Sequence, residues 1–343
     1  MDTVVVVWLA LAFVLASVAL FINGATDTAS AAAPIIATGV LRPRLALLLL
    51  ALCNFAGTFL GGKVALTIQQ GIVGQEYITL PVLCSVMVSV VAWGGIAWHM
   101  GWPVSKSHAL VAGLAGGGFA KGGMDAYYAV WNGWWNGWTK VLAGLIASPV
   151  LGFFGAMLLC YVIIALCARL NPHKSRKVFD WLQVISCSLQ ATSHGSNDGG
   201  KFYGIYRQMF VSAGVAVVGV TTGGEAATWL LLWCAAVIAA GTFFGGKRII
   251  KKIATGLGEN LASWQGCAAE TASSGVIFLA SSLGVPVSTT HVVVSGVAGS
   301  HASLGFGNVR WDTALEIVQG WVVTFPTCWV VAFLAATLTL AIF

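Results

Sequence analysis

Two short stretches carry chemically useful residues in the same order. Residues 103–108 read PVSKSH and residues 286–291 read PVSTTH, so proline, serine and histidine recur 183 positions apart. Proline stops a helix and Ser or Thr caps the next one, so each stretch predicts a new helix N-terminus. The free N–H groups and positive partial charge of such an N-terminus bind small oxyanions. Two tips that meet would hold one oxyanion from both sides.

The segment after the second stretch, VVVSGVAGS, is apolar but too short to cross a bilayer, which indicates a re-entrant half-helix. Broken backbone at membrane depth is tolerated only where it is buried in protein or lines a wet cavity. The alternative is that the hydroxyls only cap and the prolines only break helices. The candidate anion ligands are the hydroxyl residues of both tips: Ser105, Ser107, Ser288, Thr289 and Thr290.

Two acidic residues interrupt apolar surroundings at matched places in the chain. Asp27 follows Thr26 in NGATD, and Asp198 follows Asn197 in HGSND. A carboxylate within a membrane is energetically costly and marks a functional site by default. The pair predicts a cation or proton site.

Other arrangements of charge remain open. Each acid could instead pair with a structural lysine such as Lys63 or Lys201, and Glu270 in QGCAAETASSG is a third candidate acid. A cation site beside an anion site is the chemistry of cation-coupled symport, because the cation lowers the cost of carrying the anion through a low-dielectric barrier.

The elements that must position these residues are membrane helices. Only 8% of the 343 residues are charged and 58% are hydrophobic, against about 25% charged in a soluble domain. Continuous apolar runs disfavour a β-barrel, whose strands alternate, and predict an all-α polytopic protein of the cell membrane, embedded in lipid. The net charge of +6 comes largely from short basic segments, which indicates membrane anchoring rather than nucleic-acid binding. The apolar runs are 4–22, 45–62, 80–98, 141–168, 228–246, 271–285 and 314–343.

The chain consists of two similar halves. AGTFLGGK at 56–63 recurs as AGTFFGGK at 240–247, in the same order as the tips and the acids. The halves are 1–168 and 181–343, joined by a basic linker at 169–180, and internal repeats of this kind are typical of transporters.

The relative orientation of the halves depends on how the first segment is counted. If 4–22 and 28–41 cross separately the halves are antiparallel, and the basic cluster 247–252 then lies opposite the linker. If 4–41 is one broken helix, the halves are parallel and both basic clusters lie on one side, as the positive-inside rule expects.

Four motifs together resemble the inorganic phosphate transporter (PiT) family: NGATD, PVSKSH, SHGSND and PVSTTH. The similarity runs through nearly the whole chain. It implies two inverted repeats, each with a re-entrant hairpin, and an alternating-access symporter of phosphate, sometimes as a metal–phosphate complex, with Na⁺ or H⁺ and no cofactor. It also implies the antiparallel arrangement.

The resemblance also assigns residues. The tip hydroxyls and Asn197 resemble phosphate-site residues of the family, and Lys106 is a further candidate phosphate ligand. Na⁺, if it is the coupling ion, would bind Asp27 and Asp198. The candidates for the cation or proton site are Asp27, Asp198, Thr26 and Glu270.

The first half departs from the family pattern. Thr26 and Ser30 stand where Asn is usual, and Lys106 stands where a small hydroxyl residue is expected. Lys106 could pair with the anion, or with Asp27 in place of a bound Na⁺. It could also extend its ammonium to the membrane interface.

Three rival functions remain. Sulfate has the same tetrahedral size as phosphate. An intramembrane hydrolase could use Ser105 with His108 or Ser288 with His291, but duplicated residues argue against one asymmetric catalytic site, so we expect no enzyme. A passive anion channel would need no buried acids. The expected partners are phosphate, a cation and lipid; a homodimer is left open.

Overall fold

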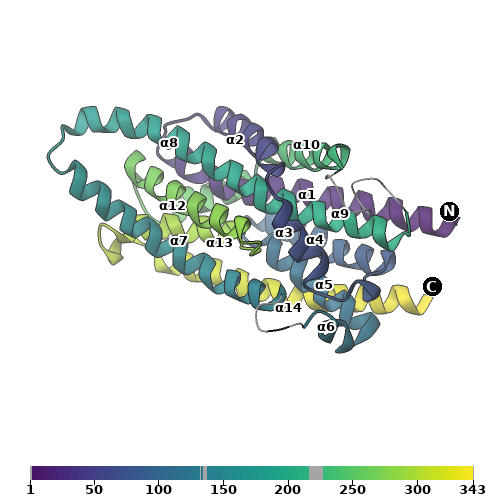
Figure 1. Cartoon of the computed structure of the whole chain (residues 1–343). Helices are drawn as coiled ribbons and strands as arrows, with labels where there is room; N and C mark the ends of the chain where they lie inside the picture. Colours follow the sequence, from purple (N-terminus) through teal and green to yellow (C-terminus); the bar gives the residue numbers. More distant parts are fainter. Residues whose placement is uncertain (1, 132, 134–136, 216–226, 343) are drawn as a thin grey trace.

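The computed structural model describes residues 2–131, 133, 137–215 and 227–342, and these form a bundle of α-helices (Figure 1). A chain in lipid must satisfy its backbone hydrogen bonds internally, which helices do. The predicted all-α fold class is confirmed. The helices are α1 (Thr3–Ala37), α2 (Pro43–Thr58), α3 (Gly62–Gln70), α4 (Leu80–Met100), α5 (Lys106–Gly122), α6 (Asp125–Tyr128), α7 (Gly137–Cys167), α8 (Pro172–His194), α9 (Gly200–Ser212), α10 (Thr228–Phe244), α11 (Lys247–Gly256), α12 (Ser263–Ser282), α13 (Thr289–Ala302) and α14 (Trp311–Ile342).

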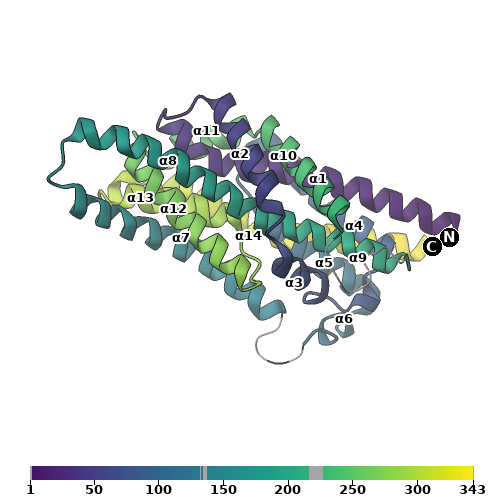
Figure 2. The same cartoon turned by 45° about the horizontal axis from the view of Figure 1, so that its top comes forward.

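Several helices are long and apolar enough to cross a membrane. Among the described residues, α1, α4, α7 and α14 qualify alone, by length and composition. Two bent pairs also qualify when each is taken as one span: α2 with α3, bent by 71°, and α10 with α11, bent by 63°. Both α10 and α11 pack along α1 (Figure 2). The chain is therefore a multi-pass membrane protein.

The first apolar segment is one helix, and the expectation that 4–22 and 28–41 cross separately is wrong. α1 is continuous over 35 residues, with Asp27 inside it and buried. The polar residues of NGATD do not interrupt the helix because their side chains find partners inside the protein rather than needing to reach water.

Two helical hairpins carry the repeated Pro-Ser stretches. One is α4–α5 and the other is α12–α13, and they enter the bundle from opposite ends (Figure 1). Each contains a glycine with a left-handed backbone two residues before the proline, Gly101 with φ +72° and Gly284 with φ +69°, a conformation that favours glycine.

The new helices begin where the sequence predicts. Ser105 caps α5 and its Oγ accepts a hydrogen bond from the backbone N of His108 at 3.2 Å. Ser288 caps α13 and accepts from the N of His291, also at 3.2 Å. The two stretches therefore form matching N-terminal tips in the protein interior.

Glycines allow the backbones of α2 and α8 to touch. A Cβ at Gly57 would collide with the carbonyl group of Thr192, and a Cβ at Gly195 would collide with that of Asn54. Close approach through small residues is a general feature of membrane helix packing. Here it brings Asn54 next to the helix that carries Asp198.

We expect Gly57→Val to destabilise the bundle, because the new side chain forces α2 away from α8. Overpacking costs about 1–3 kcal/mol, which lowers the midpoint of thermal unfolding in detergent. Gly275→Val is the matched control, since no heavy atom lies within 4 Å of a Cβ at that position. Equal midpoints for the two variants would contradict this account of the packing.

Candidate functional site

The two hairpin tips, residues 103–108 and 286–291, meet inside the bundle. Ser107 Oγ donates to the backbone oxygen of Val287 at 3.3 Å, and the rings of His108 and His291 lie edge to face with centroids 4.5 Å apart. All four residues are buried. The two stretches, 183 positions apart in the sequence, therefore pack directly against each other.

Trp321 on α14 contacts both tips. Its ring stacks on that of His291, with centroids 3.8 Å apart, and its Nε1 donates to the backbone oxygen of Pro103 at 2.8 Å. One rigid side chain thus holds the tips in register.

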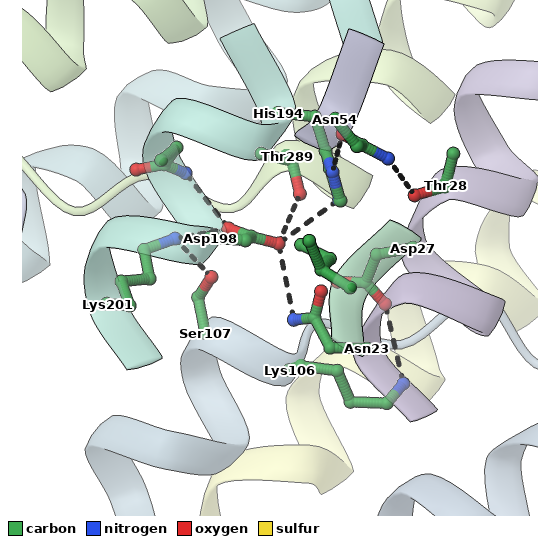
Figure 3. Close-up of polar contacts among 12 residues, drawn as sticks. Asn23, Asp27, Thr28, Asn54, Lys106, Ser107, His194, Asp198, Lys201 and Thr289 are labelled. Carbon is green, nitrogen blue, oxygen red and sulfur yellow. Dashed lines mark hydrogen bonds and ion pairs between the residues drawn. The ribbon is translucent and has the colours of Figure 1, made fainter. Parts of the chain in front are cut away.

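Asp198 lies in a π-helical turn, Gly195–Gly199, between α8 and α9 (Figure 3). Such turns are rare in proteins, and those that do occur often lie at functional sites. The amide and hydroxyl groups that donate to its carboxylate come from three different elements. Oδ1 accepts from Asn197 Nδ2 at 3.2 Å, and Oδ2 accepts from Asn23 Nδ2 and Thr289 Oγ1, each at 3.3 Å.

Lys201 neutralises Asp198 and joins it to both tips. Its Nζ lies 2.9 Å from Asp198 Oδ1, 2.5 Å from Ser107 Oγ and 2.7 Å from the backbone oxygen of Val287. An ammonium group has three N–H donors, and here each has an acceptor. The sequence alternative that Asp198 pairs with Lys201 is therefore correct.

Lys106 points inward and pairs with the other acid (Figure 3). Its Nζ lies 3.5 Å from Asp27 Oδ1 and donates to the backbone oxygen of Val104 at 3.4 Å. The residue is only 1% exposed, which excludes the alternative that it extends to the interface. Thr26 Oγ1 also contacts Asp27 Oδ1, at 3.1 Å.

A hydrogen-bond chain determines which nitrogen of His194 carries a proton. Thr242 donates its one hydroxyl proton to Ile238 O at 2.8 Å. It therefore accepts from Asn54 Nδ2, which also donates to Thr28 Oγ1 at 2.8 Å. Asn54 Oδ1 is then the acceptor, and His194 Nδ1, at 2.9 Å, is the donor.

This assignment has a consequence for the other face of the imidazole. His194 Nε2 lies 3.2 Å from Asp198 Oδ2. Without a proton on either atom, the lone pair of the nitrogen and the negative charge of the carboxylate would repel each other at this distance. A single proton, held as imidazolium or as carboxylic acid, stabilises the contact. The contact is therefore a place where the site can hold a proton.

Two predicted anion ligands have polar atoms to spare. Thr290 Oγ1 and Asn197 Oδ1 are buried and have no hydrogen-bond partner among the described residues. Buried polar atoms of this kind are rare in proteins and call for a ligand or water. By contrast, the Ser105 and Ser288 hydroxyls are used as helix caps.

Glu270 does not join this cluster. Its carboxylate accepts from Ser186 Oγ at 2.6 Å and from Gln183 Nε2 at 3.3 Å. Ser186 precedes Asp198 by 12 residues, about 18 Å along a helix axis. Glu270 is thus a separate buried acid between α12 and α8.

Residue patterns alone did not single out Asn23, Asn54 or His194 as site residues. Asn54 carried a usable signal, since it is a lone amide in the apolar run ALCNFAG, and a buried amide must find partners. Asn23 and His194 lie in the acid motifs themselves. Their roles depend on contacts between segments far apart in the chain.

A bundle of membrane-crossing helices around a closed polar site, with paired charges and facing helix tips, is the architecture of a membrane transport protein. A protein-family model described as “Phosphate transporter family” matches residues 23–332 of this chain. The chain belongs to this family.

Two relatives align with this chain over most of their length. The chain is 37% identical over 309 residues to a “Probable low-affinity inorganic phosphate transporter” of Rhizobium meliloti (strain 1021), covering 89% of each chain. It is 33% identical over 326 residues to a protein of the same name from Bacillus subtilis (strain 168), covering 94% of this chain and 93% of the relative. The family and these relatives are named as transporters, a non-enzyme class, which argues against the hydrolase alternative.

A solved structure titled “The sodium-dependent phosphate transporter” shares the fold. The TM-score is 0.84 at 23% sequence identity, covering 98% of this chain and 100% of the other.

We expect Lys201→Met to destabilise the protein by about 3–5 kcal/mol, because it leaves the Asp198 carboxylate buried without its countercharge. Adding Asp198→Asn should recover part of this loss, since the double variant buries no unpaired charge. Chemical unfolding in detergent measures both, with the exposed Lys63→Met as the matched control. A double variant no more stable than Lys201→Met would disprove the role of this ion pair.

Proposed function

We propose that this protein is a secondary active transporter that moves inorganic phosphate together with H⁺ or Na⁺ by alternating access. The observation that carries the proposal is the meeting of the two hairpin tips beside two buried acids. The names of the relatives support phosphate as the substrate.

The anion would bind between the tips. The first amides of α5 and α13 lack partners within their own helices, as at every helix N-terminus, and both N-termini favour negative charge. Thr290 Oγ1 is an unused hydroxyl in the first turn of α13. Phosphate offers four oxygens, so it can accept from both tips at once, either alone or as a metal–phosphate complex.

The cation would act on the acid side of the same site. Asp27 and Asp198 lie close enough that atoms of both, with one from His194, fall within 4.8 Å of one another. A bound cation or proton lowers the cost of carrying phosphate through the low-dielectric interior. The contact between His194 and Asp198 supplies a place for a proton.

The hairpins support alternating access. They enter the bundle from opposite ends and meet at their tips (Figure 1), as two inverted repeats, 1–168 and 181–343, would arrange them. Inverted halves are compatible with a single helix α1 if α4, which the apolar runs suggested as a crossing, is one arm of a hairpin. Movement of one half against the other would open the site to each side in turn. Asp27 and Asp198 are at most 3% exposed, as an occluded state of such a cycle would require.

Sulfate is the second candidate substrate, because it has the same shape as phosphate. The unpartnered Asn197 Oδ1 favours phosphate: it can accept the proton of HPO₄²⁻, whereas sulfate has no proton to donate at neutral pH.

Purified protein in liposomes should accumulate labelled phosphate above equilibrium when a proton or sodium gradient is imposed. Unlabelled phosphate should compete with the label, and sulfate should compete weakly. Equilibration without accumulation would indicate a channel, and equal competition by sulfate would overturn phosphate selectivity.

Asp198→Asn and Ser288→Ala should each reduce phosphate uptake by at least about tenfold, a loss of 1.4 kcal/mol in binding or transport. Asp198→Asn removes the carboxylate that pairs with Lys201, and Ser288→Ala removes the hydroxyl that caps α13. Asp312→Asn and Ser282→Ala change the same residue types at exposed positions and serve as controls. Uptake near the wild-type rate in both test variants, at equal expression, would refute the site.

A further inference from the structure

The charged groups already present at the site limit how well a sodium ion could bind its carboxylates. Sodium is a hard cation that binds several oxygen atoms, above all carboxylate, carbonyl and water oxygens. The atoms that come together here are two carboxylate oxygens and an imidazole nitrogen, from Asp27, Asp198 and His194. Whether the residues fit sodium therefore depends on whether the carboxylates have free acceptor capacity.

Asp198 has none. A carboxylate has about four lone-pair positions. Oδ1 already meets Asn197 and Lys201, and Oδ2 meets Asn23, Thr289 and the ring of His194, all within 3.3 Å. A sodium ion at Asp198 would have to displace these donors, and at Asp27 Oδ1 it would have to compete with Lys106 and Thr26.

Each buried acid also has its own buried ammonium group. Asp198 pairs with Lys201 at 2.9 Å and Asp27 pairs with Lys106 at 3.5 Å. The four charges cancel, and a proton between His194 and Asp198 adds a positive charge, so no net negative charge remains to attract a second cation. The two ammonium groups differ, because Lys201 has three acceptors within 2.9 Å.

Lys106 has looser contacts. Its Nζ meets Asp27 Oδ1 at 3.5 Å and Val104 O at 3.4 Å, both longer than an ordinary charge-assisted hydrogen bond of about 2.7–2.9 Å. It is also the first residue of α5, at the tip where the anion would bind.

We infer that Lys106 and Lys201 act as tethered cations in place of sodium, so that this transporter works without sodium. This inference rests on the proposed function and specifies its coupling ion. A tethered ammonium contributes binding energy in every cycle but cannot move down a gradient, so the driving force must come from protons. Lys201 holds the tips together, and Lys106 is the cation that meets the phosphate.

The test compares phosphate uptake into liposomes in sodium medium and in choline medium, at the same imposed proton gradient. We expect equal initial rates for the wild type. Lys106→Ser should make uptake depend on sodium by at least about fivefold, the lower range of coupling between two ligand sites. Lys121→Ser removes an exposed lysine from the same helix and should behave as wild type.

Binding of radioactive sodium to the purified proteins in detergent provides a second measurement that does not require transport. The wild type should bind no sodium specifically, and Lys106→Ser should bind it at a site that includes Asp27. If Lys106→Ser folds but does not transport phosphate, sodium binding by itself tests whether Lys106 takes the place of a sodium ion.

Three results would overturn the inference: wild-type uptake that requires sodium, specific sodium binding by the wild type, or a Lys106→Ser variant that neither binds sodium nor responds to it. A wild type that takes up no phosphate under any gradient would instead refute the proposed function.

Discussion

The carboxylate of Asp198 is fully buried in a protein that lies in a bilayer, and this constraint organises the centre of the molecule. A charge in such a place is stable only with a countercharge and a complete set of hydrogen bonds. Lys201 supplies the countercharge from one helical turn away, and its remaining donors bind Ser107 and Val287 O, on the two hairpin tips. The ion pair that neutralises the acid is therefore also the connection between the two halves of the site.

The two hairpins and the close packing of the helices bring the partners of Asp198 together. Proline and left-handed glycine end one helix of each hairpin, and a serine starts the next, so that two N-termini end in the interior. Glycines at positions such as 57 and 195 let backbones approach until Asn54 reaches His194. Chains of hydrogen bonds then orient the amide and the imidazole, which leaves one position for a proton beside Asp198.

The two acid–lysine pairs are not equivalent, and the difference is mechanistically useful. Lys201 has short contacts to three acceptors, which suits a permanent connection. Lys106 has two long contacts, which an incoming anion can replace at little cost. In the proposed cycle, an anion that replaced these contacts would release Asp27 from Lys106, and this would couple anion binding at the tip to the charge on α1.

The sequence by itself determined the all-α membrane fold, the two tips, the capping serines and the two acids, because apolar length, helix caps and charges in apolar runs are local signals. It did not determine that 4–41 contains one continuous helix, since the partners that keep Asp27 and Asn23 inside lie on other helices. Nor did it determine the direction of Lys106. A lysine near a helix end can reach water or a buried acid, and only the position of Asp27 in space decides between them. The separation of Glu270 from the cluster was likewise decided by tertiary contacts. Asp198 and Lys201 lie only three residues apart, and tertiary contacts decided that Lys201 also reaches both tips.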